Sequence, residues 1–405
     1  MSTAAMRSRG ALGTRRVLTR DGTAGVDDAF LDLAPQVYAG DRAWIPEEPD
    51  AVARAFSPAN PWFGGGGRAA TFCVPGRARL AVFRPPACRV RGRPAAFFGY
   101  WEHRGAPDAS HALFEKAAAW ARAEGAAVLY GPADFGTFGR YRLRTAAEPG
   151  ALPFPGEPYN PAAYAGVLEG AGFAVAERYV TQVGAVSWAA LGAARLALAG
   201  LRASGYRVEP LDGARWLALL PTVHAAADAI FGANPGYTPL AYPAFTAAVG
   251  APVARRLCPH TSVVAFAPDG ALAGFVVAQP HWGPVVTRGA PGGPVPLGAL
   301  DFAEHAGRLA AAEARRGLPR TAVARTVGVA PAHRRRGLLT AMGAAVLGRA
   351  RGRYDRWLGA LIRADNPSRR FGAAHARAER GYALYARALD GGPLADDAAA
   401  PGRAA

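Results

Sequence analysis

The most constraining stretch of this chain is an apolar strand that passes through a basic turn directly into a helix. The strand is predicted over 321–329, and the turn that follows reads HRRRG at 333–337. Leu338, Met342 and Val346 then recur at four-residue intervals, which predicts an amphipathic helix. Because no Ser, Thr, Asp or Asn stands before this helix as a cap, its first N–H groups are free donors beside the positive end of the helix dipole.

This turn has the chemistry of an anion-binding site. Gly337 allows a bulky anion to approach the backbone closely, and three successive arginines precede it. Free N–H groups at a helix N-terminus bind phosphate or pyrophosphate. The competing interpretation is a solvated basic turn, which would tolerate a capping residue and would not need the glycine. The sequence therefore predicts a site for phosphate or pyrophosphate at this turn.

The predicted elements repeat their order along the chain. Each half reads as a strand, two helices, three strands, and then helix, strand, helix and strand, without identity of sequence between the halves. This order predicts an α/β fold in which a mixed sheet with helices on both faces occurs twice in tandem. The first unit is expected over 15–188 and the second over 189–388, between a flexible N-terminus at 1–14 and a disordered tail at 389–405.

Local patterns predict individual elements. Apolar residues at spacings of three and four predict a helix over 27–38. The segment 131–160, rich in Gly, Pro and aromatic residues, is predicted to be a loop, and the turn at 268–270 is predicted to close a hairpin. Near the C-terminus, a helix is expected over 368–379 and a strand over 382–388.

The net charge of +17 comes almost wholly from arginine, because Lys116 is the one lysine of the chain. Together with abundant Ala, Gly and Pro, this indicates the codon bias of a GC-rich genome. A basic surface attracts polyanions in general, but no run of five like charges occurs. Nucleic acid is therefore not expected as a partner, and the oligomeric state is left open.

Cysteine usage and hydropathy bear on the compartment. The three cysteines, Cys73, Cys88 and Cys258, are scattered, which excludes a disulfide framework and a Cys-based zinc cluster and predicts a cytoplasmic location. No two histidines have metal-ligand spacing, so no metal is expected. The longest uncharged stretch, near 270–287, is interrupted by prolines, so no membrane span is expected.

The turn and helix resemble motif A of the GCN5-related N-acetyltransferases (GNAT), whose Arg/Gln-x-x-Gly-x-Gly/Ala loop holds the pyrophosphate of coenzyme A. Arg334 and Gly337 match that loop, while Leu339 stands where a small residue is usual. The segment Asp365-Asn366-Pro367 is similar to the start of the last GNAT helix, where the asparagine contacts the coenzyme. The resemblance implies an acyl-CoA co-substrate, with acetyl-CoA first among the candidates, bound by Val327, Val329, Arg334, Arg335, Arg336, Gly337, Leu338, Leu339, Thr340 and Asn366.

Further segments are similar to a bacterial family of tandem GNAT-like proteins. They read FFGYWE at 97–102, GP at 131–132 and GAGF at 170–173 in the first half, and NPGYTP at 234–239 in the second. The first half lacks the Arg-x-x-Gly-x-small loop, since HRGAP stands in its place at 103–107. The resemblance implies that the first unit is a degenerate copy that shapes the acceptor side.

The activity that the resemblance implies is direct acyl transfer from acyl-CoA to the amine of a small molecule. A backbone N–H near Val329 would stabilise the oxyanion, and the amine must lose a proton before it attacks. Asp365 is a candidate base or else a helix cap, and Tyr385 is a candidate acid or else a core aromatic. GNATs often place a tyrosine acid seven residues after the asparagine, but that position is Ala373 here.

Two other functions remain open. An aminoacyl-tRNA-dependent transferase on the same doubled fold would suit the positive charge, and a non-catalytic acyl-CoA-binding module would suit the missing tyrosine. The aromatic residues near the loops are predicted either to line an acceptor pocket or to pack between the halves; they are Trp44, Trp62, Phe63, Tyr159, Tyr164, Tyr237 and Tyr242.

Overall fold

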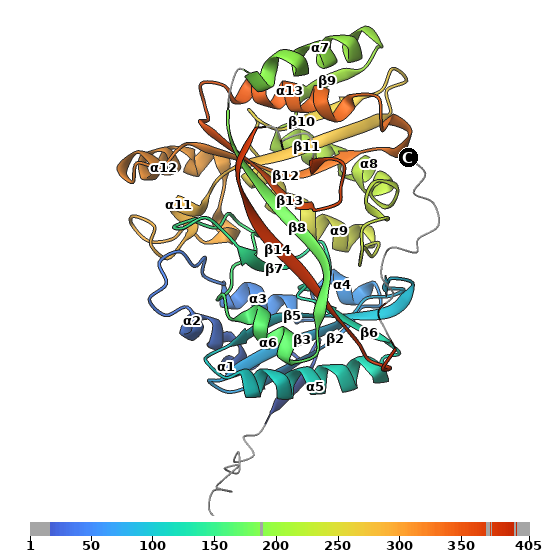
Figure 1. The fold of residues 1–405 in the computed structure, drawn as a ribbon, viewed down its shortest axis with the longest axis vertical. Coiled ribbons are helices and arrows are strands. Elements are labelled where there is room, and N and C mark those ends of the chain that lie inside the picture. Colours follow the sequence, from blue (N-terminus) through green and yellow to red (C-terminus); the bar gives the residue numbers. More distant parts are fainter. Residues whose placement is uncertain (1–16, 187–188, 370–372, 374, 393, 395–405) are drawn as a thin grey trace, which may run out of the picture.

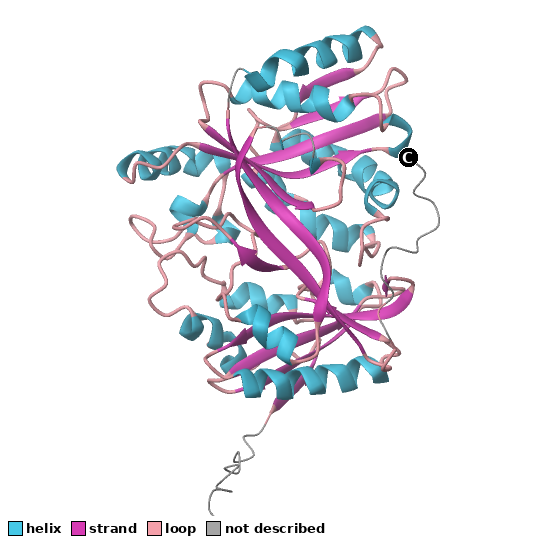
Figure 2. Cartoon of the chain, viewed as in Figure 1, coloured by secondary structure: helices cyan, strands magenta, loops and turns pink. Residues whose placement is uncertain are grey.

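The computed structural model describes residues 17–186, 189–369, 373, 375–392 and 394. Its strands form one mixed sheet of 14 strands, and helices cover both faces of this sheet (Figures 1 and 2). The α/β class predicted from the sequence is therefore confirmed. The predictions for 1–14 and for most of 389–405 lie outside the described residues.

The first half of the chain builds one end of the sheet. Its strands pair in the order β1, β2, β3, β5 and β6, and β5 and β6 run parallel. The strand bounds are β1 (Leu18–Asp21), β2 (Arg68–Val74), β3 (Ala78–Arg84), β4 (Arg89–Val90), β5 (Arg93–His103), β6 (Val128–Gly131) and β7 (Leu143–Ala146). The helix bounds are α1 (Asp28–Leu31), α2 (Leu33–Val37), α3 (Pro49–Ala55), α4 (Pro61–Gly64), α5 (Pro107–Ala123) and α6 (Tyr164–Gly170).

The second half builds the other end, with the strand order β13, β12, β11, β10 and β9. Here β12 and β13 are the parallel pair. The strand bounds are β9 (Arg207–Pro210), β10 (Val263–Phe266), β11 (Leu272–Pro280), β12 (Thr321–Val329) and β13 (Arg356–Arg363). The helix bounds are α7 (Ala189–Ala203), α8 (Gly213–Phe231), α9 (Tyr242–Val249), α10 (Ala251–Arg256), α11 (Gly283–Val286), α12 (Phe302–Arg315) and α13 (Leu338–Ala350).

The two halves exchange their last strands in the middle of the sheet. Strand β8 (Ala174–Ala185) ends the first half but pairs with β13 of the second half. Strand β14 (Ala376–Ala388) ends the second half but pairs with β6 of the first half. The two long strands also pair with each other, and they cross the centre of the molecule side by side (Figure 1). The segments 15–188 and 189–388 therefore share one sheet and do not close two separate ones.

Each half buries apolar residues on both faces of its sheet. In the first half, α5 covers the outer face, where Phe98 and Leu113 pack, and α1–α4 cover the inner face, where Phe56 and Phe83 pack. In the second half, α13 and α7 cover the outer face and α8–α10 the inner one. Because α4 contacts α9, the two inner helix layers meet between the halves.

The exchanged strand β8 requires a residue without a side chain where it meets β13. The indole of Trp357 lies across Gly184, and a Cβ on that glycine would lie 2.5 Å from the ring. The indole Nε1 of Trp357 also donates to the carbonyl of Ala185 at 3.1 Å. Any larger residue at Gly184 would therefore push β13 away from β8.

A buried ion-pair network fixes β14 to the loop between β7 and α6. Arg380 of β14 is 1% exposed and binds Glu148 at 2.7 Å and Glu157 at 2.8 Å. These contacts hold the loop against the second half, where Phe154 packs with Val323 of β12. The loop of the first half therefore covers part of the sheet of the second half.

Several local predictions are confirmed. The strand predicted over 321–329 is β12, and the helix expected after the basic turn is α13. The turn at 268–270 joins the antiparallel strands β10 and β11, and Gly270 has the positive φ of +86° that such a turn requires. These segments carry their own turn or periodicity signals, so neighbouring elements do not change them.

Other local predictions are wrong. The helix expected over 27–38 is split into α1 and α2, because Pro35 cannot donate a backbone hydrogen bond to the preceding turn. The loop predicted over 131–160 contains the short strand β7. The helix predicted over 368–379 cannot extend that far, since β14 begins at Ala376 and pairs with β8. Strand pairing there overrides the local helical preference.

We expect the substitution Arg380→Met to lower the free energy of unfolding by about 3–5 kcal/mol, because it leaves the fully buried Glu157 without its cation. The matched control is Arg320→Met, which removes an ion pair with Asp355 in which both side chains are nearly half exposed. That change should cost about 1 kcal/mol or less. Urea unfolding of both variants measures the difference, and equal losses would contradict the structural role of Arg380.

Candidate active site

The parallel strands β12 and β13 diverge after a short paired stretch, and the opening between their backbones is here called the groove of the second unit. They pair at four positions, from Thr321 opposite Arg356 to Ala324 opposite Gly359. Beyond Ala324, β12 continues to Val329 and stays paired with β11 on its other side. One edge of the last part of β12 is therefore open, as a backbone-binding groove requires.

The open edge of β12 carries alternate backbone groups. The N–H of Ala330 donates to the carbonyl of Ala273 at 2.9 Å, so Ala330 faces β11. Because backbone groups alternate along a strand, the N–H groups of Val327 and Val329 face the groove. Val327 is also one of the large apolar side chains that remain exposed, at 38%. These two predicted cofactor-binding positions therefore stand along one edge of the groove.

The basic turn joins the groove to the N-terminus of α13. Arg335 and Gly337 both have positive φ, +60° and +76°. Gly337 is the N-cap, and no side chain caps the helix, so the first N–H groups, at Leu338, Leu339 and Thr340, have no partner within the helix. A Cβ on Gly337 would meet no atom within 4 Å. The N-terminus is therefore open to a ligand, as predicted.

The three arginines of the turn differ in their contacts. Arg334 donates to the carbonyl of Val329 at 3.2 Å and to that of Ile230 at 3.0 Å, so it braces the turn against β12 and α8. Arg335 and Arg336 are exposed, and within the described part of the chain their side chains make no hydrogen bond or ion pair. The turn therefore has two exposed cations, Arg335 and Arg336, while Arg334 stabilises the conformation of the turn.

Asp365 and Asn366 follow the carboxyl end of β13. The carboxylate of Asp365 binds Arg363, and its side chain is 43% exposed. The side-chain oxygen of Asn366 accepts the N–H of Ser368 at 2.9 Å, which closes a local turn. Both residues lie at the end where β12 and β13 diverge.

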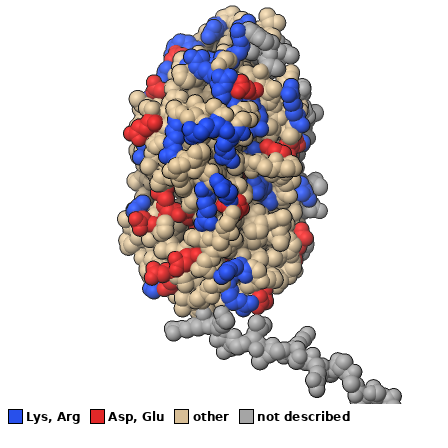
Figure 3. Space-filling model, turned by 90° about the vertical axis from the view of Figure 1, so that its left-hand side faces the viewer, with Lys and Arg blue, Asp and Glu red and all other residues tan. Residues whose placement is uncertain are grey.

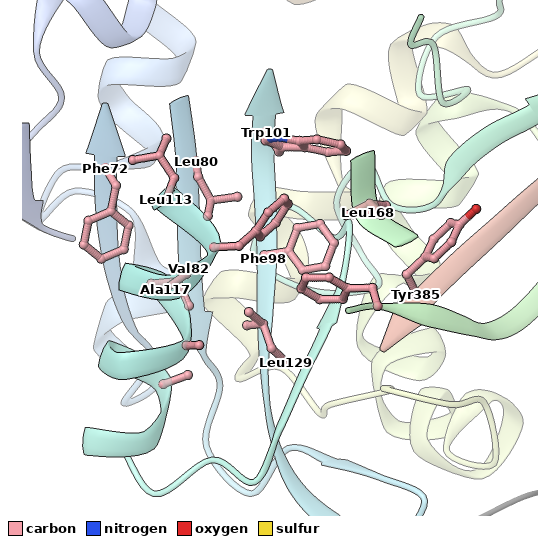
Figure 4. Packing of buried hydrophobic residues seen from close by; sticks show 14 of the residues in the cluster. Phe72, Leu80, Val82, Phe98, Trp101, Leu113, Ala117, Leu129, Leu168 and Tyr385 are labelled. Atoms are coloured by element: carbon pink, nitrogen blue, oxygen red, sulfur yellow. The ribbon is translucent and has the colours of Figure 1, made fainter. Parts of the chain in front are cut away.

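Tyr385, the predicted acid, lies in the first half of the molecule because β14 is exchanged. It pairs with Gly131 of β6 and with Val175 of β8. Its ring is 2% exposed and packs in the core with Phe98 and Leu168, and its hydroxyl points away from that cluster (Figure 4). Tyr385 therefore belongs to the sheet of the first unit and not to the turn at 333–337.

The first half has the equivalent pair of diverging strands but not the anion site. Strands β5 and β6 pair from Ala95 to Phe97 and then separate. Helix α5 follows β5, but it begins with Pro107, which has no N–H to offer. Asp108 in its first turn places a carboxylate there, paired with Arg77 at 2.9 Å. The N-terminus of this helix is therefore less suited to an anion than that of α13.

A network centred on Glu102 fills the groove of the first unit. Glu102 is 4% exposed and accepts hydrogen bonds from the hydroxyls of Tyr164 at 2.7 Å and Tyr38 at 3.1 Å. It lines a cavity of about 40 Å³, together with Tyr159 and Tyr164. Burial raises the pKa of Glu102 to about 7, although the nearby Arg79 opposes this shift.

The other buried charges beside Glu102 are paired with one another. Arg79 binds Glu47 at 2.6 Å, and Arg140 binds both Glu47 at 3.2 Å and Asp134 at 3.1 Å. Because these two arginines and two carboxylates balance, a charge on Glu102 would be uncompensated. Burial is the main reason why the carboxyl holds its proton to nearly neutral pH, and Arg79 and Arg140 oppose this only in part because they are already paired.

Sequence analysis did not single out Glu102 or Arg325 as site residues. Each is a charged residue in a strand of mainly apolar residues, which is a signal visible in the sequence. Of the aromatic residues predicted to line an acceptor pocket, Tyr159 and Tyr164 line the cavity of the first unit. Trp62 instead packs in the inner core of that unit.

No family model and no curated protein matches the chain. Among solved structures, the GCN5-related glucosamine N-acetyltransferase region of a fungal multi-domain GH3 β-N-acetylglucosaminidase aligns with 93% of this chain and 38% of that chain, with a TM-score of 0.50 and 10% identity. A conserved protein of unknown function from Enterococcus faecalis V583 aligns with 93% of this chain and 73% of its own, with a TM-score of 0.50 and 9% identity. A tandem GNAT protein from the clavulanic acid biosynthesis pathway aligns with 94% of this chain and with 100% of its own, with a TM-score of 0.47 and 15% identity.

The topology and these likenesses define the class of fold. A parallel strand pair that diverges, with a helix crossing over between its strands, occurs once in each half. The chain therefore has the fold of the GCN5-related N-acetyltransferases, and it has that fold twice in tandem. The resemblance seen in the sequence is confirmed at the level of fold.

Within the described residues, no helix is long and apolar enough to cross a membrane, and no group of three His, Cys, Asp or Glu side chains could hold a metal ion. On the face shown in Figure 3, basic side chains are interspersed with acidic ones along the height of the molecule. Cys73, Cys88 and Cys258 are free and buried.

We expect Glu102→Gln to stabilise the protein increasingly as the pH rises. The native state keeps the proton of Glu102 to about pH 7, whereas an unshifted glutamate loses it near 4.5, so the stability of the wild type falls across this window. The gain of the glutamine variant over the wild type should reach the order of 3 kcal/mol by pH 8.

Urea unfolding between pH 5 and pH 8 measures this gain. The control is Glu115→Gln, because the ion pair with Arg387 lowers the pKa of Glu115 and its charge is favourable in the native state. The control variant should show no gain at high pH. Parallel stability profiles for both variants and the wild type would rule out an uncompensated charge on Glu102.

Proposed function

We propose that the chain is an acyl-CoA-dependent N-acyltransferase whose second unit binds the coenzyme and whose acceptor is the amine of a small molecule. The observation that supports this most is the course of β12 into α13. The free N–H groups of Val327 and Val329 lead along the groove to the uncapped helix N-terminus. Acyl-CoA presents amide groups and then a pyrophosphate in the same order.

The residues of the second unit have separate roles in this binding. The groove-side N–H groups of β12 hold the pantetheine amides in an extended line. The N–H groups at the start of α13 bind the pyrophosphate, and the helix dipole favours its charge. Arg335 and Arg336 are exposed beside that position and add charge-assisted contacts. Arg334 keeps the turn in shape through the carbonyl of Val329.

Acyl-CoA would supply an activated thioester, and this chain supplies position and polarity. A groove-side N–H of β12 stabilises the oxyanion that forms when the amine attacks. The amine must be neutral to attack, so its proton passes to Asp365 or to water. As the C–N bond forms, the C–S bond of the thioester breaks, and the coenzyme A thiolate leaves and takes up the second proton of the nitrogen directly or through water. Asp365 stands where β13 ends, at the mouth of the groove. Tyr385 has no role here because it lies in the sheet of the first unit.

The first unit closes the acceptor side of the groove. Its loop places Phe154 against Val323 of β12, and Gly156 lies against the guanidinium of Arg325. Since the loop is anchored through Arg380, the shape of the acceptor side depends on the exchanged strand β14. A single GNAT unit would lack this wall.

We expect wild-type protein to bind acetyl-CoA at one site and Gly337→Asp to lose at least about 100-fold in affinity. The substitution forces a side chain onto a φ of +76° and puts a carboxylate where the pyrophosphate would bind. Isothermal titration calorimetry measures both affinities. Binding by the wild type should weaken with salt, because Arg335 and Arg336 attract the phosphates through solvent.

The matched control is Gly352→Asp, at the other end of α13. Gly352 has a φ of +75°, and a Cβ there would also meet no atom within 4 Å, so the strain and the free space are the same as at Gly337. This variant should bind acetyl-CoA as the wild type does. If the wild type does not bind at low salt, or if both variants lose binding equally, the proposed coenzyme site is wrong.

A further inference from the structure

Arg325 stands at the inner end of the groove between β12 and β13. It is the first residue of β12 beyond the last pair with β13, which joins Ala324 to Gly359. On the other side, the register with β11 shifts between Ala324 and Thr326, so Arg325 is the bulged residue. Four residues separate it from Val329, roughly 13 Å along a strand. Arg325 is therefore far from the turn that would bind pyrophosphate.

The guanidinium of Arg325 has no anionic partner in the described structure. It lies 5.3 Å from the ring centre of Phe154, and its Nη2 comes within 2.9 Å of where a Cβ on Gly156 would be. Its Nη1 is shielded from solvent and makes no hydrogen bond. The nearest contacts thus shape and hold the side chain without neutralising it.

Arg142 of the first half lines the cavity beside Glu102 and also reaches strand β13 of the second half. It is 6% exposed, and its guanidinium lies 3.5 Å and 3.9 Å from the ring centres of Tyr141 and Tyr179. It donates to the carbonyl of Leu361 in β13 at 3.3 Å, while its Nε is buried and has no hydrogen-bond partner. Leu361 follows Gly359 by two residues, so this contact lies across the groove from β12, near Arg325.

The two arginines repel each other, and the nearby Tyr141 and Glu157 offset this only in part. Burial, then the charges of Arg142 and Arg256, lower the pKa of Arg325 to about 10. Glu157 is the nearby acid, but it already binds Arg380.

Besides Arg142, two arginines in the described structure are fully buried, and both have anionic partners. Arg79 and Arg380 each bind a carboxylate at 2.8 Å or less. Among the described residues, neither the buried Arg142 nor the partly buried Arg325 makes an ion pair. A buried cation is stable when an anion accompanies it. Arg142, with a second unpaired arginine beside it, therefore indicates a place for an anion supplied from outside the chain.

We propose that Arg142 and Arg325 form a binding site for a carboxylate group of a substrate, at the inner end of the groove of the second unit. The inference rests on the proposed function in taking that groove as the place of acyl transfer. The guanidinium of Arg142 lies between two aromatic rings, and that of Arg325 lies against the ring of Phe154. A planar guanidinium can donate two parallel hydrogen bonds to the two oxygens of a carboxylate. The carboxylate is carried either by the acceptor amine or by the acyl group, and these two sources are separable by experiment.

The first experiment measures the anion site without any acyl transfer. Thermal unfolding is followed in sodium succinate and in sodium chloride at the same ionic strength. Succinate should raise the melting temperature of the wild type by about 2 °C and leave that of Arg325→Met unchanged. In chloride, Arg325→Met should melt above the wild type, because a buried unpaired cation has been removed.

Two further variants make this result interpretable. Arg315→Met removes an exposed arginine at the end of α12 and should respond to succinate as the wild type does. Arg142→Gln removes the opposite cation and should lose the response, as Arg325→Met does. If succinate shifts the wild type and both groove variants equally, the proposed site is wrong. The result does not depend on acetyl-CoA binding, so it stands even if the coenzyme site at Gly337 fails its own test.

The second experiment identifies the source of the carboxylate. If the acyl group carries it, succinyl-CoA should bind the wild type at least about tenfold more tightly than acetyl-CoA, and Arg325→Met should abolish the difference. If the acceptor carries it, the two thioesters should bind equally. In that case β-alanine should raise the melting temperature of the wild type but not that of Arg325→Met. β-Alaninamide, in which a neutral amide replaces the carboxylate, should raise neither. Equal binding of the thioesters with no response to β-alanine overturns the proposal.

Discussion

The pairing of β8 with β14 is the interaction on which the rest of the structure depends. Each strand ends one half of the chain and completes the sheet of the other half, so neither half has a complete sheet alone. Arg380 lies within β14 and is buried with Glu148 and Glu157. Such a buried network adds little net stability against apolar residues, but breaking it is costly, so it specifies the register of β14 against the loop it binds.

The two grooves of the molecule share a topology and differ in their chemistry. In the first unit, Pro107 and Asp108 close the helix N-terminus to an anion, and Glu102 occupies the groove with hydrogen bonds to two tyrosines. In the second unit, the helix is uncapped behind Gly337, and Arg325 is left without an anion. The carboxyl group in the first groove therefore has hydrogen-bond donors from the protein, whereas the helix N-terminus beside the second groove has N–H groups without a partner in the helix.

Much of the fold and part of the site could be predicted from the sequence. Strand β12, the basic turn and α13 are defined by local signals, since periodicity and the glycine at 337 act over a few residues. The role of Tyr385 could not be predicted in this way. Its place on the last strand suggested the second unit, but pairing with Gly131 puts it in the first. Strand exchange depends on contacts between residues distant in the sequence, which local patterns do not report.

The sequence by itself determined the class of fold and the uncapped basic turn, because both follow from apolar spacing, missing caps and backbone freedom at Gly337. The tertiary structure decided which half each final strand completes and which charges remain unpaired. Arg142 and Arg325 are 183 positions apart, and only the packing of the first half's loop onto β12 and β13 brings them to one groove. Whether a buried charge lacks an opposite charge depends on burial and on the groups that lie near it in space. Neither can be deduced from a residue's neighbours along the chain.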